Sequence, residues 1–201
     1  IDDYITRILN VTAATHYIGF FGKDGEKNFR HSWATLKPYK ETRSSEAWSE
    51  YFKPKVKKHF EDKWGFLGVG KLEADDAVII AHHQFKKAGW DIIHVGEDKD
   101  MKQVGEFKRY NPKKKLFENV SHWDGRKFFW SQMIMGDSGD NINGIHGQGA
   151  ASSYVKAILA LGSPSEERMF EIVRDAYIHK YEDNYLYYMV ENYILLNMLT
   201  K

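Results

Sequence analysis

The sequence contains no cysteine, and this absence removes several kinds of chemistry. Disulfide bonds, thiolate-bound zinc and cysteine nucleophiles all need that side chain. A chain of 201 residues is nevertheless long enough to bury a hydrophobic core of its own. The composition therefore predicts a self-standing globular fold that suits a reducing compartment.

Long apolar runs are missing too, and so is any excess of charge of one sign. No stretch approaches the roughly 20 apolar residues of a membrane-spanning helix, and residues 1–4 have neither the basic region nor the apolar core of a signal peptide. We therefore expect no membrane partner. The 29 Lys and Arg residues nearly balance the 28 Asp and Glu residues, so evidence for a nucleic-acid partner has to be local.

Apolar spacing predicts helices that alternate with strands along the first two thirds of the chain. Ala77, Ile80 and Ala81 recur at helical spacing, for example, and a short apolar strand follows the stop at Gly89. This alternation is typical of an α/β sheet, on which we expect the helical last third to pack. The predicted helices cover residues 3–15, 44–64, 73–88, 125–135, 148–161, 166–181 and 185–199, and the predicted strands cover 16–21, 29–33, 91–95, 103–107 and 115–119.

Three short acidic motifs lie where a predicted element begins or ends. If they converge, several like charges lie close together, which is unfavourable unless cations neutralise them. Carboxylate oxygens favour hard ions such as Mg²⁺ or Mn²⁺, and several carboxylates suit a pair of ions about 3.5 to 4 Å apart. The motifs are Glu73-Ala74-Asp75-Asp76, Asp98-Lys99-Asp100 and Gly136-Asp137-Ser138-Gly139-Asp140-Asn141.

Each motif taken alone has an ordinary explanation. An Asp-x-Asp after a strand is usually a turn, and acidic residues at a helix start usually cap it. A calcium-binding EF-hand loop is excluded because its twelfth position requires Glu. Counted from Asp98 that position is Arg109, and counted from Asp137 it is Gln148.

Taken together and in this order, the motifs resemble those of the 5′ nuclease family, which includes phage 5′→3′ exonucleases and flap endonucleases. Residues 73–76 are similar to the acidic helix start of that family, 97–100 to its Asp-x-Asp after a strand, and 135–149 to its Gly-Asp-x-x-Asp-Asn segment. Upstream, Phe29-Arg30 and the segment 38–43 resemble the base of its helical arch. The resemblance covers residues 16–160 with the spacing preserved.

The resemblance implies a PIN-like α/β fold with a mostly parallel sheet flanked by helices over residues 1–124, an arch over 44–70, and a helix-three-turn-helix with further helices over 125–201. It also implies hydrolysis of phosphodiester bonds in DNA, or in RNA primers, with two Mg²⁺ or Mn²⁺ ions. Lys40 and Arg43 are expected to face the scissile phosphate, and Tyr39 to stack on a terminal base. The implied metal ligands are Glu73, Asp75, Asp76, Asp98, Asp100, Asp137 and Asp140.

Two further segments are expected to hold nucleic acid. In the glycine-rich segment 141–156, backbone amides and a helix N-terminus can approach a phosphate, and the family's equivalent grips duplex DNA around a K⁺ ion. In the basic helix before Trp64, cations and aromatic rings suit a sequence-tolerant groove for a single-stranded 5′ end. The ordinary alternatives are a loop and a solvated helix face. The candidate residues are Gly144, Gly147, Gly149, Ser152 and Ser153 in the first segment, and Lys53, Lys55, Lys57 and Lys58 in the second.

One part of the family pattern has no match here. The family's first metal ligand is an Asp that ends a strand near the N-terminus, and a further acidic position is matched only by Asp24, which is offset. We therefore expect a separate N-terminal segment to complete the sheet. The expected partners are 5′ flaps, nicks and duplex ends of DNA, or RNA–DNA hybrids, bound by a monomer in the cytosol of a bacterium or a phage-infected host.

Two alternatives remain at this point. One is a DNA-binding module of the same fold that has lost catalysis together with the first Asp. The other is a phosphatase similar to the haloacid dehalogenases, whose motifs also include Asp-x-Asp and a later Gly-Asp loop. That enzyme class places a whole domain between the two motifs, whereas Asp100 and Asp137 lie close in this sequence. It also leaves the acidic residues 73–76 unexplained.

Overall fold

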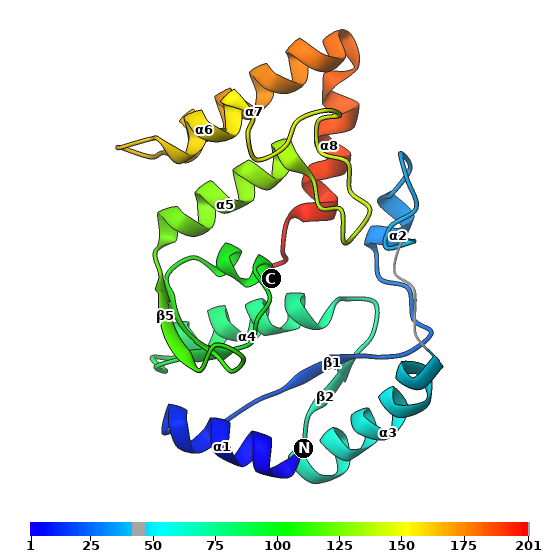
Figure 1. Ribbon diagram of the computed structural model, residues 1–201, viewed down its shortest axis with the longest axis vertical. Helices are drawn as coiled ribbons and strands as arrows, with labels where there is room; N and C mark the ends of the chain where they lie inside the picture. Colours follow the sequence, from blue (N-terminus) through cyan, green and yellow to red (C-terminus); the bar gives the residue numbers. More distant parts are fainter. Residues whose placement is uncertain (42–46, 201) are drawn as a thin grey trace.

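The computed structural model describes residues 1–41 and 47–200, with the backbone alone at residues 47 and 48. Helices dominate, and the strands are short (Figure 1). The elements are α1 (Asp2–Thr12), β1 (Phe20–Gly22), α2 (Arg30–Trp33), α3 (Ala47–Trp64), β2 (Leu67–Val69), α4 (Ala74–Lys87), β3 (Ile93–Val95), the 3₁₀ turn η1 (Asp100–Val104), β4 (Phe107–Asn111), β5 (Leu116–Val120), α5 (His122–Met135), α6 (Ser153–Leu159), α7 (Glu166–Tyr181), η2 (Glu182–Asn184) and α8 (Tyr185–Leu196).

The described strands form two small sheets, and most of their pairings are parallel. In the first sheet β1 pairs with β2 in parallel, with Phe20 opposite Leu67. In the second sheet β3 pairs with β4 in parallel and β4 pairs with β5 in an antiparallel hairpin. Helix α4 contacts both sheets, because it packs on β1 and its His82 hydrogen-bonds to His94 of β3. The predicted α/β class and its mostly parallel pairing are therefore confirmed.

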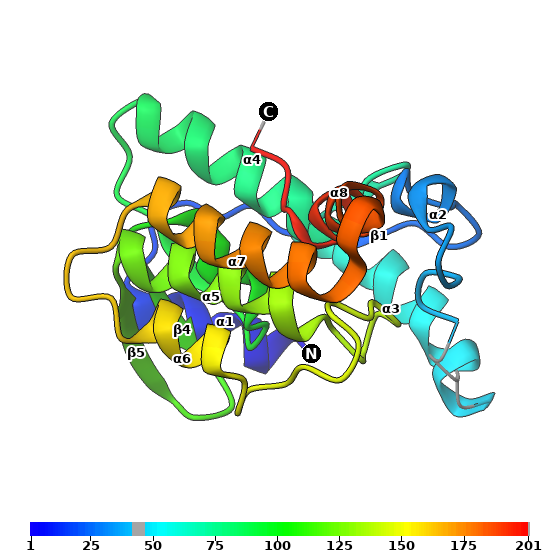
Figure 2. The same ribbon diagram turned by 90° about the horizontal axis from the view of Figure 1, so that it is seen from above.

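Two hydrophobic clusters hold these elements together. The larger one joins α5, α6, α7 and α8, which lie against one another in Figures 1 and 2. Its fully buried members include Phe129, Met133, Ile158, Met169, Val173 and Tyr177. The smaller cluster lies between α4, η1 and the β4–β5 hairpin and consists of Ile79, Met101, Val104, Phe107, Val120 and Met198.

Three of the C-terminal helices begin at a serine, which explains why they start where they do. Ser121 accepts a hydrogen bond from Asp124 N, Ser152 from Tyr154 N and Ser165 from Arg168 N. A serine in this position supplies an acceptor to the otherwise unpaired amides of a first helical turn. Because Ser152 caps α6, the helix begins five residues later than the predicted start at residue 148.

Local structure replaces one predicted strand and moves another along the chain. The segment 29–33 was expected to be a strand, but Asn28 Oδ1 accepts a hydrogen bond from Arg30 N at 3.0 Å and starts the helical turn of α2. The first hairpin strand, expected over 103–107, lies at 107–111, because the 3₁₀ turn η1 occupies residues 100–104.

The C-terminal tail after α8 runs into the centre of the molecule, between α5 and α4 (Figure 1). Gln103 fixes it through its side-chain amide, which donates to Leu196 O at 3.0 Å and accepts from Met198 N at 3.2 Å. The tail therefore belongs to the interior.

Along residues 1–41 and 47–200, none of the helices combines the length and the apolar character that crossing a bilayer requires.

Candidate active site: a pocket of carboxylates

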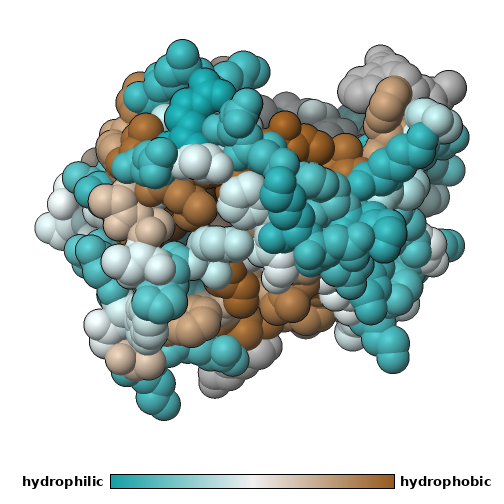
Figure 3. All heavy atoms as spheres, turned by 90° about the horizontal axis from the view of Figure 1, so that it is seen from below, coloured by the Kyte–Doolittle hydropathy of each residue, from teal (hydrophilic) through white to brown (hydrophobic). Residues whose placement is uncertain are grey.

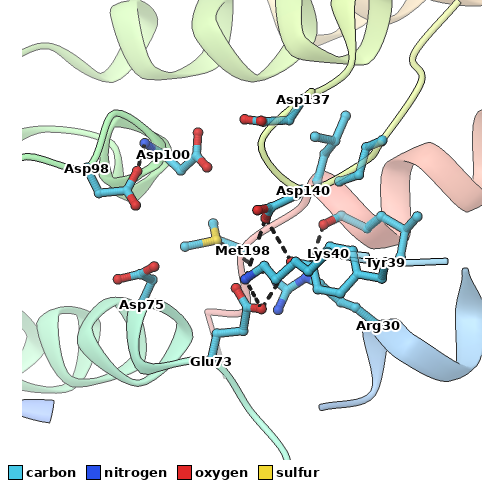
Figure 4. A pocket seen from close by; sticks show the side chains of 13 residues that line it. Arg30, Tyr39, Lys40, Glu73, Asp75, Asp98, Asp100, Asp137, Asp140 and Met198 are labelled. Carbon is cyan, nitrogen blue, oxygen red and sulfur yellow. Dashed lines mark hydrogen bonds and ion pairs between the residues drawn. The ribbon is translucent and has the colours of Figure 1, made fainter. Parts of the chain in front are cut away.

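Six of the seven predicted metal ligands line one pocket of about 100 Å³ at the centre of the molecule. They come from three separate places: the start of α4, the segment between β3 and η1, and the loop after α5. Figure 4 shows Asp75, Asp98, Asp100 and Asp137 around one side, while Glu73 and Asp140 point towards Lys40. The remaining lining residues are Arg30, Tyr39, Lys40, Ile142, Leu195, Leu196 and Met198.

Backbone geometry fixes the loop that carries Asp137 and Asp140. Asp137 and Ile142 exchange two backbone hydrogen bonds of 2.8 and 2.9 Å, which close the loop. At its neck Gly136 and Gly144 lie against each other with positive φ, and a Cβ on Gly144 would lie 2.2 Å from Gly136 N. Only glycine fits so close an approach. The two carboxylates are therefore held on a closed loop at one wall of the pocket.

The pocket acids repel one another in the absence of a cation. Burial, followed by the charges of Asp98 and Glu73, raises the pKa of Asp75 to about 6. Burial, followed by the charge of Asp98, raises the pKa of Asp100 to about 6, although a hydrogen bond from Gln132 opposes the shift. Such shifts mark a site where negative charge has been gathered at an energetic cost.

Two lysines offset part of this negative charge. The ammonium group of Lys40 contacts Glu73 and lies 3.6 Å from Asp140 Oδ2. Lys99 lies 2.8 Å from Asp137 Oδ2 and is more exposed. Lys40 was predicted from its motif, whereas Lys99 was missed although it lies inside the Asp98-Lys99-Asp100 motif. Gln132, which donates to Asp100 Oδ1 at 2.8 Å, has no sequence pattern that would have identified it.

Tyr39 does not lie where a base-stacking residue would have to be. Its side chain is buried, and its hydroxyl lies 3.0 Å from both Glu73 Oε1 and Asp140 Oδ2, which share its single proton as acceptors. Burial and then the neighbouring carboxylates raise the pKa of Tyr39, so the hydroxyl remains a neutral donor. The expectation of stacking on a terminal base is therefore corrected: Tyr39 joins two walls of the pocket.

Asp76 is the seventh predicted ligand, and it lies outside the pocket. Its two carboxylate oxygens accept from the Arg30 guanidinium at 2.6 and 2.8 Å, and both side chains are almost fully buried. Burial alone would raise the pKa of Asp76, but the Arg30 guanidinium outweighs it and holds the pKa below its ordinary value. The metal role expected for Asp76 is therefore replaced by a structural ion pair.

Arg30 also binds the C-terminal tail, which sequence reasoning did not anticipate. Its guanidinium donates to Leu195 O at 3.1 Å and Asn197 O at 2.9 Å, while Asp76 Oδ1 accepts from Leu199 N at 3.1 Å. The resemblance of Phe29-Arg30 to the family motif singled out Arg30 but did not indicate its role. The pair joins α2, α4 and the tail beneath the carboxylates.

The lysines of α3 are only partly free to contact a partner. Lys53, Lys55 and Lys58 are exposed, but Lys55 lies over the Tyr51 ring at 3.5 Å and Lys58 pairs with Asp62 at 2.9 Å. Lys57 is bound to Asp24 and to Gly22 O, each at 2.5 Å, so it anchors α3 to β1. Asp24 is thereby also placed outside the pocket. Arg43 lies outside the described residues.

The glycine-rich segment divides into a buried and an exposed part. Gly144 is buried at the neck of the acidic loop, so it is not placed to contact a phosphate as expected. Gly147 and Gly149 are exposed, and a Cβ on either would meet nothing within 4 Å. Ser152 caps α6, and Ser153 lies exposed at its start.

The comparisons with known proteins bear on the fold. No protein-family model matches the sequence, and no curated protein matches it. Among solved structures, the bacteriophage T5 protein co-crystallised with metal ions superposes with a TM-score of 0.60 at 19% identity, covering 97% of this chain and 91% of that one. The T5 5′-exonuclease with bound divalent zinc ions gives 0.59 at 20% identity, covering 98% and 91%. The T5 flap endonuclease in a pseudo-enzyme-product complex with DNA and metal ions gives 0.59 at 19% identity, covering 96% and 89%.

The chain has the fold of the T5 5′-exonuclease. In this 5′-exonuclease fold the pocket acids offer only oxygen atoms, which suits a hard divalent cation. No group of three or more acidic or histidine side chains within 1–41 and 47–200 is arranged to hold one ion directly. Mg²⁺ commonly retains several waters and takes only one or two carboxylates. The six acids of the pocket therefore fit hydrated ions better than a closed protein cage.

The raised pKa values predict how the stability of this 5′-exonuclease fold depends on pH. Between about pH 4 and 6 the folded chain holds more protons on Asp75 and Asp100 than the unfolded chain, so their contribution lowers the free energy of unfolding as the pH rises through that window. Mn²⁺ is expected to raise the melting temperature more at pH 7.5 than at pH 5. Thermal unfolding with EDTA and with Mn²⁺ at both pH values measures this.

The matched control is the Asp75→Asn/Asp100→Asn variant, in which both titrating carboxyls are absent. In EDTA, the melting temperature of this variant is expected not to show the decline between pH 4 and 6. Without EDTA, Mn²⁺ is expected to change it little. An equal response to Mn²⁺ in the variant and the parent would contradict binding of the ion in this pocket.

Proposed function

We propose that the chain is a structure-specific 5′ nuclease that hydrolyses phosphodiester bonds of DNA, at flaps, nicks or duplex ends, and of RNA primers. One observation carries the proposal: six carboxylates from three distant stretches line one pocket next to Lys40. The shared fold supports it, because the T5 relative was solved with DNA and metal ions. Within this proposal the chain acts as a monomer.

Two divalent ions, Mg²⁺ or Mn²⁺, are proposed to bind among these carboxylates and to supply an activated water and stabilisation of the leaving oxygen. The side chains of the pocket hold these ions and bind the phosphate. Asp75, Asp98, Asp100 and Asp137, which lie around one side of the pocket (Figure 4), hold the cations. Lys40 stabilises charge on the scissile phosphate, because a preorganised cation in a partly buried site acts more strongly than in water.

The nucleic acid is proposed to contact two exposed surfaces. Lys53, Lys55 and Tyr51 on α3 accept the single-stranded 5′ end through charge and ring stacking. The exposed backbone at Gly147 and Gly149, with Ser153, receives the duplex phosphates near the start of α6, where we also propose a K⁺ ion. Neither contact reads base edges, so the proposed recognition depends on structure rather than on sequence.

A further extended segment is proposed to pair with the free strand edges. Within the described residues, β1 pairs only with β2 and β3 only with β4, so each has one unpaired edge. Apolar side chains near these edges are exposed, among them Ile18, Leu67 and Val95, and one face of the molecule shows apolar patches framed by polar side chains (Figure 3). An added strand would satisfy both edges and cover apolar surface.

A cleavage assay on a 5′-labelled DNA flap tests the proposed function. With Mn²⁺ or Mg²⁺ we expect short labelled products, and with EDTA we expect none. A nicked duplex, which lacks the 5′ single strand of the flap, and the monoester p-nitrophenyl phosphate serve as comparison substrates. Hydrolysis of the monoester alone would indicate a phosphatase, and binding without cleavage would indicate a DNA-binding module; either result overturns the proposal.

A further inference from the structure

A buried carboxylate in α8 binds the segment that precedes Lys40. Glu191 is only 5% exposed, and its Oε1 accepts from Thr35 N at 3.0 Å and Leu36 N at 2.9 Å. Its Oε2 accepts from the Thr35 hydroxyl, which also contacts the hydroxyl of Tyr187. A buried charge is costly unless it is hydrogen-bonded, and these charge-assisted bonds meet that requirement.

The same segment is held at its other end by the acidic loop. Asn141 Nδ2 donates to Pro38 O at 2.8 Å, and Lys40 N donates to Asp140 O at 3.0 Å. Lys40 itself has a φ of 58°, in the left-handed region that residues with a side chain seldom adopt. Such a conformation persists only where the surroundings determine it. The two anchors therefore fix the backbone from which the Lys40 side chain reaches Glu73 and Asp140.

The two anchors come from different parts of the fold. Helix α8 lies beside α2 in both ribbon views, and the two helices are in contact (Figures 1 and 2). The Glu191 carboxylate on α8 accepts hydrogen bonds from two consecutive backbone amides of the segment. Without it, Thr35 N and Leu36 N would each lose their acceptor, and the start of the segment would lose its bonds to this carboxylate, while the bonds at the end that carries Tyr39 and Lys40 would remain.

We propose that Glu191 is a positioning residue that holds Lys40 at the carboxylate pocket. It does not touch the pocket and acts only through the segment 35–40. The inference rests on the proposed function only for its effect on cleavage, because the placement of Lys40 is measurable without any substrate. Glu191→Leu removes every acceptor, whereas Glu191→Gln keeps the Oε1 oxygen that receives both amides.

The first experiment measures the accessibility of Lys40 directly. Formaldehyde and borohydride methylate exposed lysines, and mass spectrometry gives the rate at each position. In Glu191→Leu we expect the rate at Lys40 to rise several-fold and the rate at Lys57 to stay unchanged. Lys57 is a matched control, because its side chain is 23% exposed against 20% for Lys40 and it pairs with Asp24 far from α8. In Glu191→Gln neither rate is expected to change.

The second experiment measures flap cleavage in a double-variant cycle. Glu191→Leu is expected to lower kcat by on the order of 10- to 100-fold, as misplacement of a catalytic group by about 1 Å does. Glu191→Gln is expected to retain the parent rate. In a Lys40→Met background, Glu191→Leu is expected to cause no further loss. If Glu191→Leu fails to fold, Glu191→Asp replaces it, since the shorter side chain withdraws both oxygens while keeping the charge.

The outcomes separate the two proposals. An unchanged methylation rate at Lys40, an equal rise at Lys57, or a loss of cleavage that multiplies with that of Lys40→Met would each overturn the positioning role. A chain that cuts no nucleic acid while Glu191→Leu still exposes Lys40 selectively would overturn the proposed function and leave the positioning role supported.

Discussion

Replacing Asp100 by Asn is expected to slow 5′-flap cleavage by on the order of a thousandfold, because cation-bound charge stabilisation is worth several kcal/mol and each 1.4 kcal/mol is about tenfold in rate. Asp75→Asn is expected to act in the same way. In Asp100→Asn the new side-chain amide oxygen would still accept the hydrogen bond that Gln132 donates to Asp100 Oδ1, so the local structure is retained. Single-turnover rates with saturating Mn²⁺ measure the effect.

The same two variants are expected to be more stable than the parent in EDTA. Burial, followed by repulsion from neighbouring carboxylates, raises the pKa of Asp75 and Asp100 to about 6, and loss of either charge removes both costs at that position. Loss of activity combined with gain of stability is typical of residues whose charges serve function. Asp24→Asn is the control, because Asp24 is 62% exposed and lies outside the pocket. Unchanged cleavage by both pocket variants would exclude the pocket from the chemistry.

Replacing Arg30 by Met is expected to reduce the free energy of unfolding by about 3 to 5 kcal/mol, the cost of leaving a buried charge without its partner. Arg30 and Asp76 are 1% and 0% exposed, so the Asp76 carboxylate would stay buried without the guanidinium. The substitution also removes the donors of Leu195 O and Asn197 O. Urea unfolding followed by circular dichroism gives the change.

Two further variants test whether this loss comes from the unpaired charge. Arg30→Met/Asp76→Leu, which replaces the whole pair by apolar groups, is expected to recover much of the stability. Arg168→Met breaks an exposed pair with Glu171 and is expected to cost less than about 1 kcal/mol. A double variant less stable than Arg30→Met, or an Arg30→Met variant as stable as Arg168→Met, would contradict the assigned role of the pair.

The acids that form the pocket were predictable because their place in the chain determines their place in the fold. Asp98 follows β3, Glu73 precedes α4, and Asp137 follows α5, so each lies at an element end, where side chains from different elements meet. The order and spacing of the motifs supplied the rest of the prediction. The fold that the resemblance implied is the fold found, which is that of the T5 5′-exonuclease.

Asp76 shows why the same reasoning failed one residue further along the helix. Successive residues of an α-helix point about 100° apart, so Asp75 faces the pocket while Asp76 faces the interior. Which partner it meets there depends on Arg30 and on Leu199, which lie 46 and 123 positions away. A motif records neighbours along the chain and contains no information about such distant partners.

The role of Tyr39 was misjudged, and Glu191 was overlooked, for the same reason. Tyr39 lies in a motif typical of a nucleic-acid contact, but it hydrogen-bonds Asp140 at a distance of 101 positions. Glu191 lies in an aromatic helix that indicated only packing, and its partners Thr35 and Leu36 are more than 150 positions away. The segment 29–33 differs: there a single nearby side chain, Asn28, outweighed the strand pattern.

The route of residues 195–199 has a consequence for the order of synthesis. Arg30 and Asp76 emerge early from the ribosome, but the backbone groups that complete their hydrogen bonds belong to Leu195, Asn197 and Leu199. Leu196 and Met198 supply part of the wall around the acids. A nascent chain that lacks this tail therefore lacks part of the pocket wall and the backbone groups that complete the hydrogen bonds of Arg30 and Asp76, so the pocket is finished only when the last segment has been made.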